Sequence, residues 1–214
     1  MSINKKEIIF RIQNTDTFSN PKVELEQYCI NASCAVDIIF FAGFEFNDIK
    51  KRFIIDLGTG TGRLSIASSF FQPIYILSVD IDLSALLILK KNIMNLRLEH
   101  LIFPICADVN NFEISKFHLP KNLKITTIMN PPFGVQKRRA DRIFLKRAFT
   151  FSDTIYSIHL AHNEVHNFIS NFIRKYNWKI DYVLPFKMML EKTFEFHQYR
   201  KKIIDVNLYR FIKK

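Results

Sequence analysis

The sequence predicts an α/β protein built on a doubly wound, mostly parallel sheet. Two patterns indicate this fold class: short apolar runs alternate with amphipathic stretches, and each of the first four runs leads into a polar residue. Strands that alternate with helices favour parallel pairing, because each helix returns the chain to the start of the next strand. After an N-terminal helical region we expect seven strands, at residues 53–55, 74–79, 101–106, 125–129, 154–159, 179–184 and 203–211, and helices at 63–71, 84–96, 142–149 and 165–176.

We expect a single domain over residues 1–214, with an N-terminal helical cap (1–48) and an α/β core (49–214). The length suits one good-sized domain, and 48% of the residues are hydrophobic, so a core can be built. The N-terminus carries no secretory pattern, and the longest apolar stretch (35–44) is about half the ~20 residues that span a bilayer. We therefore expect a cytoplasmic protein without a membrane segment.

Four polar side chains stand at the ends of the first four predicted strands. They are Asp56, Asp80, Asp108 and Asn130. In a doubly wound sheet, ligands bind beyond the carboxyl ends of the strands. We therefore expect these four residues to converge on one crevice.

A glycine-rich turn follows the first predicted strand, in the segment 56–62, Asp-Leu-Gly-Thr-Gly-Thr-Gly. Glycines let the backbone approach a ligand closely and aim the N–H groups that start the next helix at it. The nicotinamide fingerprint G-x-G-x-x-G fails, because Arg63 stands where its last glycine would be. The segment resembles the cofactor loop of class I methyltransferases, whose fold is Rossmann-like and whose sheet has an antiparallel last strand.

This resemblance implies S-adenosylmethionine as the cofactor. It assigns the glycine backbone to the methionyl part, Asp80 to the ribose hydroxyls and Asp108 to the adenine amine. The alternative is a tight strand–helix turn that binds nothing. The cofactor-binding residues that we expect are Gln27, Asp56, Gly58, Thr59, Gly60, Thr61, Gly62, Asp80, Ile81, Asp108, Val109 and Asn130.

The tetrad Asn130-Pro131-Pro132-Phe133 follows the fourth predicted strand and supplies the expected catalytic residues. Such a tetrad suits the methylation of an adenine amine, which is a poor nucleophile because its lone pair is delocalised into the ring. The side-chain oxygen of Asn130 and the carbonyl of Pro131 could accept its two N–H bonds, while Phe133 stacks a flipped base. The tetrad resembles the signature of methyltransferases that act on planar amines and amides. By itself it does not separate adenine in DNA, adenine or guanine in RNA, and a protein glutamine.

Further segments resemble the small-subunit ribosomal RNA adenine-N6 methyltransferases of eukaryotes and archaea. The resemblance implies methylation of one ribosomal adenine to N6-methyladenosine, with a small zinc-binding activator protein as a frequent partner. It also implies that Gln27 helps to close over the cofactor. Cys29-Ile30 replaces the usual Pro-Thr, and Leu160 the usual Lys. The matching segments are 18–22, 25–28, 156–159, 196–197 and 204–208, and the run 136–142 is similar to the archaeal branch.

The net charge of +11, from 31 basic and 20 acidic residues, indicates a polyanionic partner, and the resemblance implies that this partner is ribosomal RNA. Runs of basic residues are also common on solvated faces. Here, however, the basic residues cluster directly after the predicted catalytic tetrad and before the last predicted strand, which favours contact with phosphate. Four aromatic residues, Phe40, Phe41, Phe44 and Phe46, could leave an apolar patch for the activator. The residues that we expect to contact RNA are Lys137, Arg138, Arg139, Arg142, His197, Arg200, Lys201 and Lys202, with Lys146 and Arg147 nearby.

Other functions remain open. Protein glutamine N-methyltransferases share the tetrad but prefer Tyr at its fourth position and carry an extra N-terminal domain. A noncatalytic RNA-binding or ribosome-assembly module would keep the fold without binding the donor. We expect no metal site, because His162 and His166 lack the Glu that would follow the first His of a zincin motif, and His159 belongs to a strand.

Overall fold

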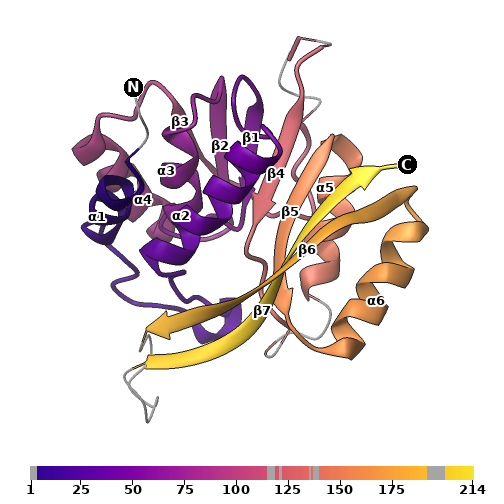
Figure 1. Cartoon of the computed structure of the whole chain (residues 1–214). Helices are drawn as coiled ribbons and strands as arrows, with labels where there is room; N and C mark the ends of the chain where they lie inside the picture. The colour runs from indigo at the N-terminus through magenta and orange to yellow at the C-terminus, as the bar shows by residue number, and fades with distance from the viewer. Residues whose placement is uncertain (1–3, 115–118, 121, 135, 137–139, 192–200) are drawn as a thin grey trace.

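The computed structural model describes residues 4–114, 119–120, 122–134, 136, 140–191 and 201–214, without the side chains of 190, 191, 201 and 202 (Figure 1). The helical elements are α1 (Lys5–Gln13), η1 (Val23–Leu25), α2 (Ala32–Phe40), η2 (Phe41–Glu45), α3 (Arg63–Ser69), α4 (Leu83–Leu96), α5 (Ala140–Phe151) and α6 (Asn163–Arg174). The strands are β1 (Phe53–Leu57), β2 (Tyr75–Asp80), β3 (Ile102–Cys106), β4 (Ile125–Met129), β5 (Thr154–Leu160), β6 (Trp178–Glu191) and β7 (Lys201–Lys213).

These strands form one seven-stranded sheet in the order β3-β2-β1-β4-β5-β7-β6. The first five strands in this order pair in parallel, and β7 runs antiparallel to both β5 and β6. The predicted fold class is confirmed, including the antiparallel last strand. Among the described residues no helix is long and apolar enough to cross a membrane.

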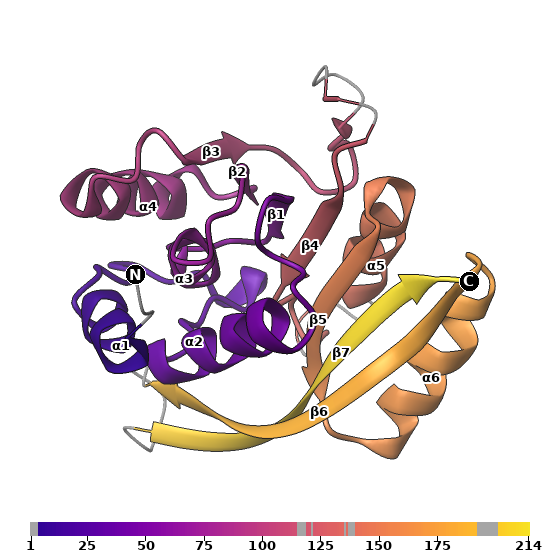
Figure 2. The ribbon, with the colours of Figure 1, turned by 45° about the horizontal axis from the view of Figure 1, so that its top comes forward.

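Helices cover both faces of the sheet (Figure 2). The alternation of side chains along β1 sends Ile54 into one apolar cluster and Ile55 into the other. The first cluster packs α1 to α4 against the sheet, and the second packs α5 and α6 against the opposite face. Because both faces are buried, every residue of β1 and of β4 is buried.

The hairpin of β6 and β7 is longer than the sequence predicts. The expected strands 179–184 and 203–211 become 178–191 and 201–213. Pro185 breaks the pattern of a central strand because it has no N–H to donate, but β6 is the edge strand of the sheet, where a proline is tolerated. The pairing therefore continues past Pro185, opposite Asn207.

Most of the aromatic residues proposed as an apolar patch pack against one another. Phe40 meets Phe71 edge-on at 5.1 Å, and Phe41 and Phe46 both pack on Tyr182. Only Phe44 among the four proposed residues is classed as exposed, at 59%. Among these four residues, Phe44 therefore presents the largest exposed fraction to solvent.

A buried charge cluster joins the segment before β1 to β5 and β7. The carboxylate of Asp48 is fully buried and accepts hydrogen bonds from the hydroxyl of Tyr156 at 2.7 Å and from Nε of Arg210 at 2.8 Å. Arg52 forms an ion pair with its other oxygen at 2.5 Å. Arg210 also pairs with Asp181 of β6. The cluster links elements that are more than a hundred residues apart in the sequence.

We expect Asp48→Ala to lower the free energy of unfolding by about 3–5 kcal/mol, because the change removes the buried carboxylate that pairs with the partly buried guanidinium groups of Arg52 and Arg210. Urea unfolding measures this loss. Asp37→Ala is the matched control, since Asp37 pairs with Lys5 where their side chains are 55% and 48% exposed, and it should cost no more than about 1 kcal/mol. Equal effects of the two changes would contradict the stabilising role of the cluster.

Candidate active site

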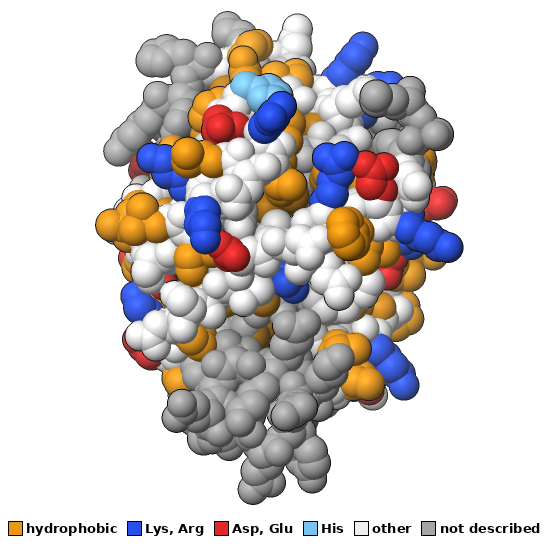
Figure 3. All heavy atoms as spheres, turned by 90° about the vertical axis from the view of Figure 1, so that its left-hand side faces the viewer, with side chains coloured by type: hydrophobic (Ala, Val, Ile, Leu, Met, Phe, Trp, Pro, Cys, Tyr) orange, Lys and Arg blue, Asp and Glu red, His pale blue; other side chains and the backbone are white. Residues whose placement is uncertain are grey.

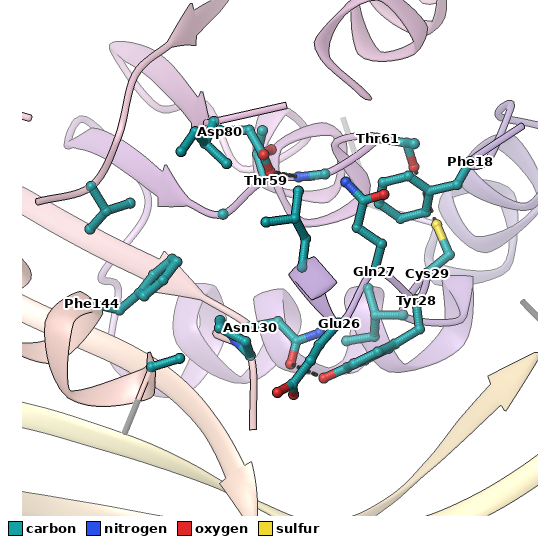
Figure 4. A pocket seen from close by; sticks show the side chains of 18 of the residues that line it. Phe18, Glu26, Gln27, Tyr28, Cys29, Thr59, Thr61, Asp80, Asn130 and Phe144 are labelled. Carbon is teal, nitrogen blue, oxygen red and sulfur yellow. Dashed lines mark hydrogen bonds between the residues drawn. The ribbon is translucent and has the colours of Figure 1, made fainter. Parts of the chain in front are cut away.

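A cleft opens at the carboxyl ends of the parallel strands. The register places Leu57 beside Val79 and Met129, so the residues that follow leave the sheet at one level. The cavity there has a volume of about 240 Å³. The predicted site residues that line it are Gln27, Gly58, Thr59, Gly60, Thr61, Gly62, Asp80, Ile81, Asp108, Val109, Asn130 and Pro132 (Figure 4).

The glycine turn is joined to the end of β2 through one carboxylate. The N–H of Gly60 donates to Oδ2 of Asp80 at 2.8 Å, and the N–H of Asp82 donates to Oδ1 at 2.9 Å. Gly60 has a φ of +55°, and a Cβ there would lie 2.8 Å from the ring of Phe18. Burial raises the pKa of Asp80. The turn and this acid therefore form one rigid wall of the cleft.

Asp56 lies inside β1 and is not among the residues that line the cleft. Its Oδ2 accepts three hydrogen bonds: from Oγ1 of Thr59 at 2.8 Å, and from the N–H and the hydroxyl of Ser65 at 3.1 and 2.7 Å. Burial raises the pKa of Asp56 to about 6, although these hydrogen bonds oppose the shift. Asp56 thus orders the glycine turn from behind.

Residues 18–30, here called the covering segment, form a second wall, which adjoins the glycine turn. Phe18 and residues 24–30 line the cleft. Gln27 is buried, donating from Nε2 to Asp82 at 2.7 Å and accepting from the N–H of Lys22 at 2.8 Å. The ammonium of Lys22 pairs with Asp82 at 2.7 Å. Gln27 therefore anchors the covering segment to the loop after β2.

Asp82 was not identified from the sequence, although it holds this anchor. Burial alone would raise the pKa of Asp82, but hydrogen bonds from Gln27, Lys22 and Ser84 hold it well below the usual range. Asp82 also caps α4 through the N–H of Ser84. An Asp two residues before Ser84, ahead of an apolar helix, is a recognisable N-cap pattern, so this signal was present in the sequence. Its partners Lys22 and Gln27 are far away in the chain and left no such signal.

The tetrad begins directly after β4, with Asn130 and Pro132 on the cleft. The hydroxyl of Tyr28 donates to Oδ1 of Asn130 at 3.4 Å, and the rings of Tyr28 and Phe133 stack with centroids 5.5 Å apart. Pro131 and Phe133 are not among the lining residues. Tyr28 was not predicted as a site residue, because its contacts with the tetrad span more than a hundred residues of sequence.

The remaining walls come from the end of β3 and from α5. Oδ1 of Asp108 accepts from the N–H and from Nδ2 of Asn110, at 2.9 and 3.0 Å. Phe144 of α5 lies over the turn, and a Cβ on Gly58 would come within 2.9 Å of its ring. Phe144 was missed because a phenylalanine in an amphipathic helix is usually a core residue.

Of the predicted RNA contacts, only the side chain of Arg142 falls within the described part of the chain. Its guanidinium lies 3.8 Å from the centroid of the Phe168 ring. Lys201 and Lys202 begin β7. On the face formed by α1 and α4, side chains of both charges are interspersed with apolar ones (Figure 3). The predicted contacts that lie outside the described residues or side chains are Lys137, Arg138, Arg139, His197, Arg200, Lys201 and Lys202.

His159, His162 and His166 differ in their local surroundings. His159 is buried in β5, where its ring hydrogen-bonds Ser157 at 2.7 Å and burial lowers its pKa to about 3. His162 precedes α6 as its N-cap residue, and His166 stacks on Tyr209. Within the described ranges, no cluster of three His, Cys, Asp or Glu side chains could hold a metal ion.

The sheet order, the glycine turn after β1 and the cleft between that turn and Asn130 define a class I methyltransferase. Residues 42–118, which include the turn, Asp80 and Asp108, match the family model of ribosomal protein L11 methyltransferase. The tetrad lies outside that match. The family model therefore supports the cofactor half of the cleft rather than the substrate half.

Whole-chain relatives extend this comparison. The chain is 32% identical over 208 residues to an uncharacterized protein of Methanocaldococcus jannaschii, covering 95% of this chain and 91% of the relative. It is 34% identical to a candidate RNA methyltransferase from Pyrococcus horikoshii, whose crystal structure superposes with a TM-score of 0.86 over 100% of this chain and 99% of that one. It is also 28% identical to the rRNA N(6)-adenosine-methyltransferase METTL5 of Danio rerio, over 96% of this chain and 97% of the relative. The chain belongs to the methyltransferase family of the two archaeal proteins.

The buried carboxyl of Asp56 should titrate near pH 6, and NMR of its carboxyl carbon measures this directly. The folded pKa lies above the unfolded value, so the folded state binds more protons between about pH 4 and 6. The contribution of Asp56 to stability should therefore fall by about 3 kcal/mol as the pH rises through this window. Asp56→Asn should remove that part of the pH dependence of urea unfolding. A carboxyl that titrates at or below pH 4 would contradict its burial.

Proposed function

We propose that the protein transfers a methyl group from S-adenosylmethionine to N6 of an adenine in small-subunit ribosomal RNA. The observation that carries the proposal is the position of Asn130 on the same cleft as the glycine turn and Asp80. A hydrogen-bond acceptor for an amine and a site for a methyl donor thus share one cavity. Direct transfer of the methyl group from sulfur to nitrogen requires this arrangement.

The residues of the cleft fit S-adenosylmethionine. Gly58 and Gly60 have φ values of +72° and +55°, and side chains there would meet Phe144 and Phe18, so only glycine keeps this wall open. Asp80 presents a carboxylate at the edge of the cleft, where it would hold the ribose hydroxyls, and Asp108 would hold the adenine amine. When bound, the donor supplies an electrophilic methyl group on a sulfonium sulfur.

The tetrad would prepare the amine for attack. Oδ1 of Asn130 and the carbonyl of Pro131 would accept the two N–H bonds and so favour a geometry that frees the nitrogen lone pair. Consecutive prolines fix φ, which holds these acceptors still. As the nitrogen–methyl bond forms and the sulfur–methyl bond breaks, the amine becomes strongly acidic. Its proton can then pass to water through the same acceptors, so no strong base is required.

Ribosomal RNA as the substrate is supported by the relatives and by charge. METTL5 of Danio rerio is named an rRNA N(6)-adenosine-methyltransferase and matches along nearly the whole chain. The net charge of +11 suits a phosphate backbone. The small subunit, and a small zinc-binding activator as partner, follow from the family resemblance of the segments 18–22 and 25–28. A cytoplasmic location fits the same proposal.

Asn130→Ala should lower methyl transfer to unmodified small-subunit ribosomal RNA by about 100-fold or more, as expected when an oriented polar group is removed from a reacting centre. The assay uses labelled S-adenosylmethionine and identifies the product nucleoside as N6-methyladenosine by mass spectrometry. Asn95→Ala on α4, away from the cleft, is the matched control and should keep wild-type transfer. Labelling that survives Asn130→Ala would remove Asn130 from the reaction. A label found on a protein glutamine would favour the amide substrate instead.

Neutralising Arg138 and Arg139 together should flatten the salt dependence of RNA binding. Each cation that contacts a phosphate contributes about 0.7–0.9 to the slope of log affinity against log salt, so the double change should reduce the slope by about 1.4–1.8. Filter binding at several salt concentrations measures it. An unchanged slope would show that these two arginines do not contact phosphate.

A further inference from the structure

The side chain of Tyr28 lies against two groups of the tetrad at once. Its hydroxyl donates to Oδ1 of Asn130 at 3.4 Å. Its ring stacks on Phe133, with the ring planes 28° apart. Tyr28 belongs to the covering segment and not to β4, so it reaches Asn130 from a different part of the chain (Figure 4).

These two groups are the ones that the proposed reaction assigns to the target base. Oδ1 of Asn130 would accept an amine hydrogen, and Phe133 would stack the adenine ring. A ring held between two others needs contacts of about 3.5 Å on each face, or on the order of 7 Å between the outer rings. The centroids of Tyr28 and Phe133 are 5.5 Å apart. The base therefore cannot reach Phe133 on this side while Tyr28 stays where it is.

The contact between Tyr28 and Asn130 is weak enough to be replaced. At 3.4 Å it is longer than the usual 2.5–3.0 Å of a hydroxyl–oxygen hydrogen bond. Burial raises the pKa of Tyr28 well above its ordinary value, so the hydroxyl keeps its proton and remains a donor. An adenine amine offers the same kind of donor, attached to a ring that can stack.

The residues on either side of Tyr28 are held by shorter hydrogen bonds than its own side chain: after Tyr28, the carbonyl of Ile30 accepts from the guanidinium of Arg63 at 2.8 Å, and before it, Glu26 and Gln27 are held through their side chains. Gln27 is bonded to Asp82 at 2.7 Å. Oε1 of Glu26 accepts from the N–H of Gln136 at 2.8 Å, which joins the covering segment to the chain after the tetrad. A rotation of the Tyr28 side chain can therefore open the site while the segment keeps its place over the donor cavity.

We propose that Tyr28 is a placeholder for the target base. In the RNA-free protein its ring stacks on Phe133 and its hydroxyl bonds Asn130, and the flipped adenine displaces it from both contacts. The inference rests on the proposed function. It adds a positioning residue that keeps the stacking face covered until a base replaces both contacts. A base without an exocyclic amine replaces the stack but not the hydrogen bond, so displacement of Tyr28 also favours adenine over uracil.

A placeholder lowers the apparent affinity for RNA, because RNA can bind only the fraction of molecules in which the site is free. Tyr28→Phe removes the hydrogen bond to Asn130 but keeps a ring. The KM for RNA should therefore fall by about two- to tenfold, the range set by one weak hydrogen bond. Tyr75→Phe is the matched control and should leave KM at the wild-type value, because Tyr75 begins β2, at the end of the strand away from Asp80 and the cleft. A KM that is unchanged or raised in Tyr28→Phe overturns the proposal.

NMR provides a readout that needs no methyl transfer. The chain has seven tyrosines, and with ring-labelled tyrosine the signal that disappears in Tyr28→Phe identifies Tyr28. Adding adenosine in the presence of S-adenosylhomocysteine should shift this signal, and uridine at the same concentration should shift it less. If Tyr28 shifts but no RNA is methylated, the placeholder stands and the proposed function fails. A Tyr28 signal that does not move with adenosine overturns the placeholder, whatever the methylation assay gives.

Discussion

The parallel alignment of β2, β1 and β4 is the constraint on which the rest of the site depends. Because Leu57 lies between Val79 and Met129, the three strands end level, and the residues that follow them meet at one edge of the sheet. The hydrogen bond from Gly60 to Asp80 then fixes the glycine turn against the neighbouring strand. Asn130 lies near Gly60 and Asp80 because it follows β4, which pairs with β1 on the side away from β2. Sheet register thus places Asn130 and the glycine turn on one cavity.

The covering segment makes a cavity out of this open edge. Its anchor is a buried polar network. The carboxylate of Asp82 accepts hydrogen bonds from the side chains of Lys22 and Gln27, and the same carboxylate caps α4. Inside proteins such networks are strong when every member is satisfied, and they specify one arrangement. The same segment brings Tyr28 to the tetrad. One stretch of chain therefore covers the cavity proposed for the donor and contacts the two residues proposed for the target base, which would link donor binding physically to base entry.

Local patterns in the sequence were sufficient to predict the fold and the residues that line the cleft at the ends of the strands. Strand–helix alternation predicted the sheet, and the acid that ends β2 and the Asn after β4 were found because each closes an apolar run. Contacts between distant segments left no such signal. Asp56 has the sequence context of a ligand-binding acid, but the structure turns its carboxylate inward to Thr59 and Ser65. The contacts of Tyr28 with Asn130 and Phe133, and the anchor at Asp82, depend on how the N-terminal segment crosses the sheet, which local periodicity does not encode.

The most direct test of this account is a crystal structure of the protein with S-adenosylhomocysteine, refined far enough to place the ligand unambiguously. The account predicts that the ligand lies in the cavity between the turn at Gly58–Gly62 and the covering segment, with its ribose at Asp80 and its sulfur on the side that faces Asn130. A ligand bound elsewhere, or one whose sulfur points away from Asn130, would contradict the claim that donor and substrate share a single cleft.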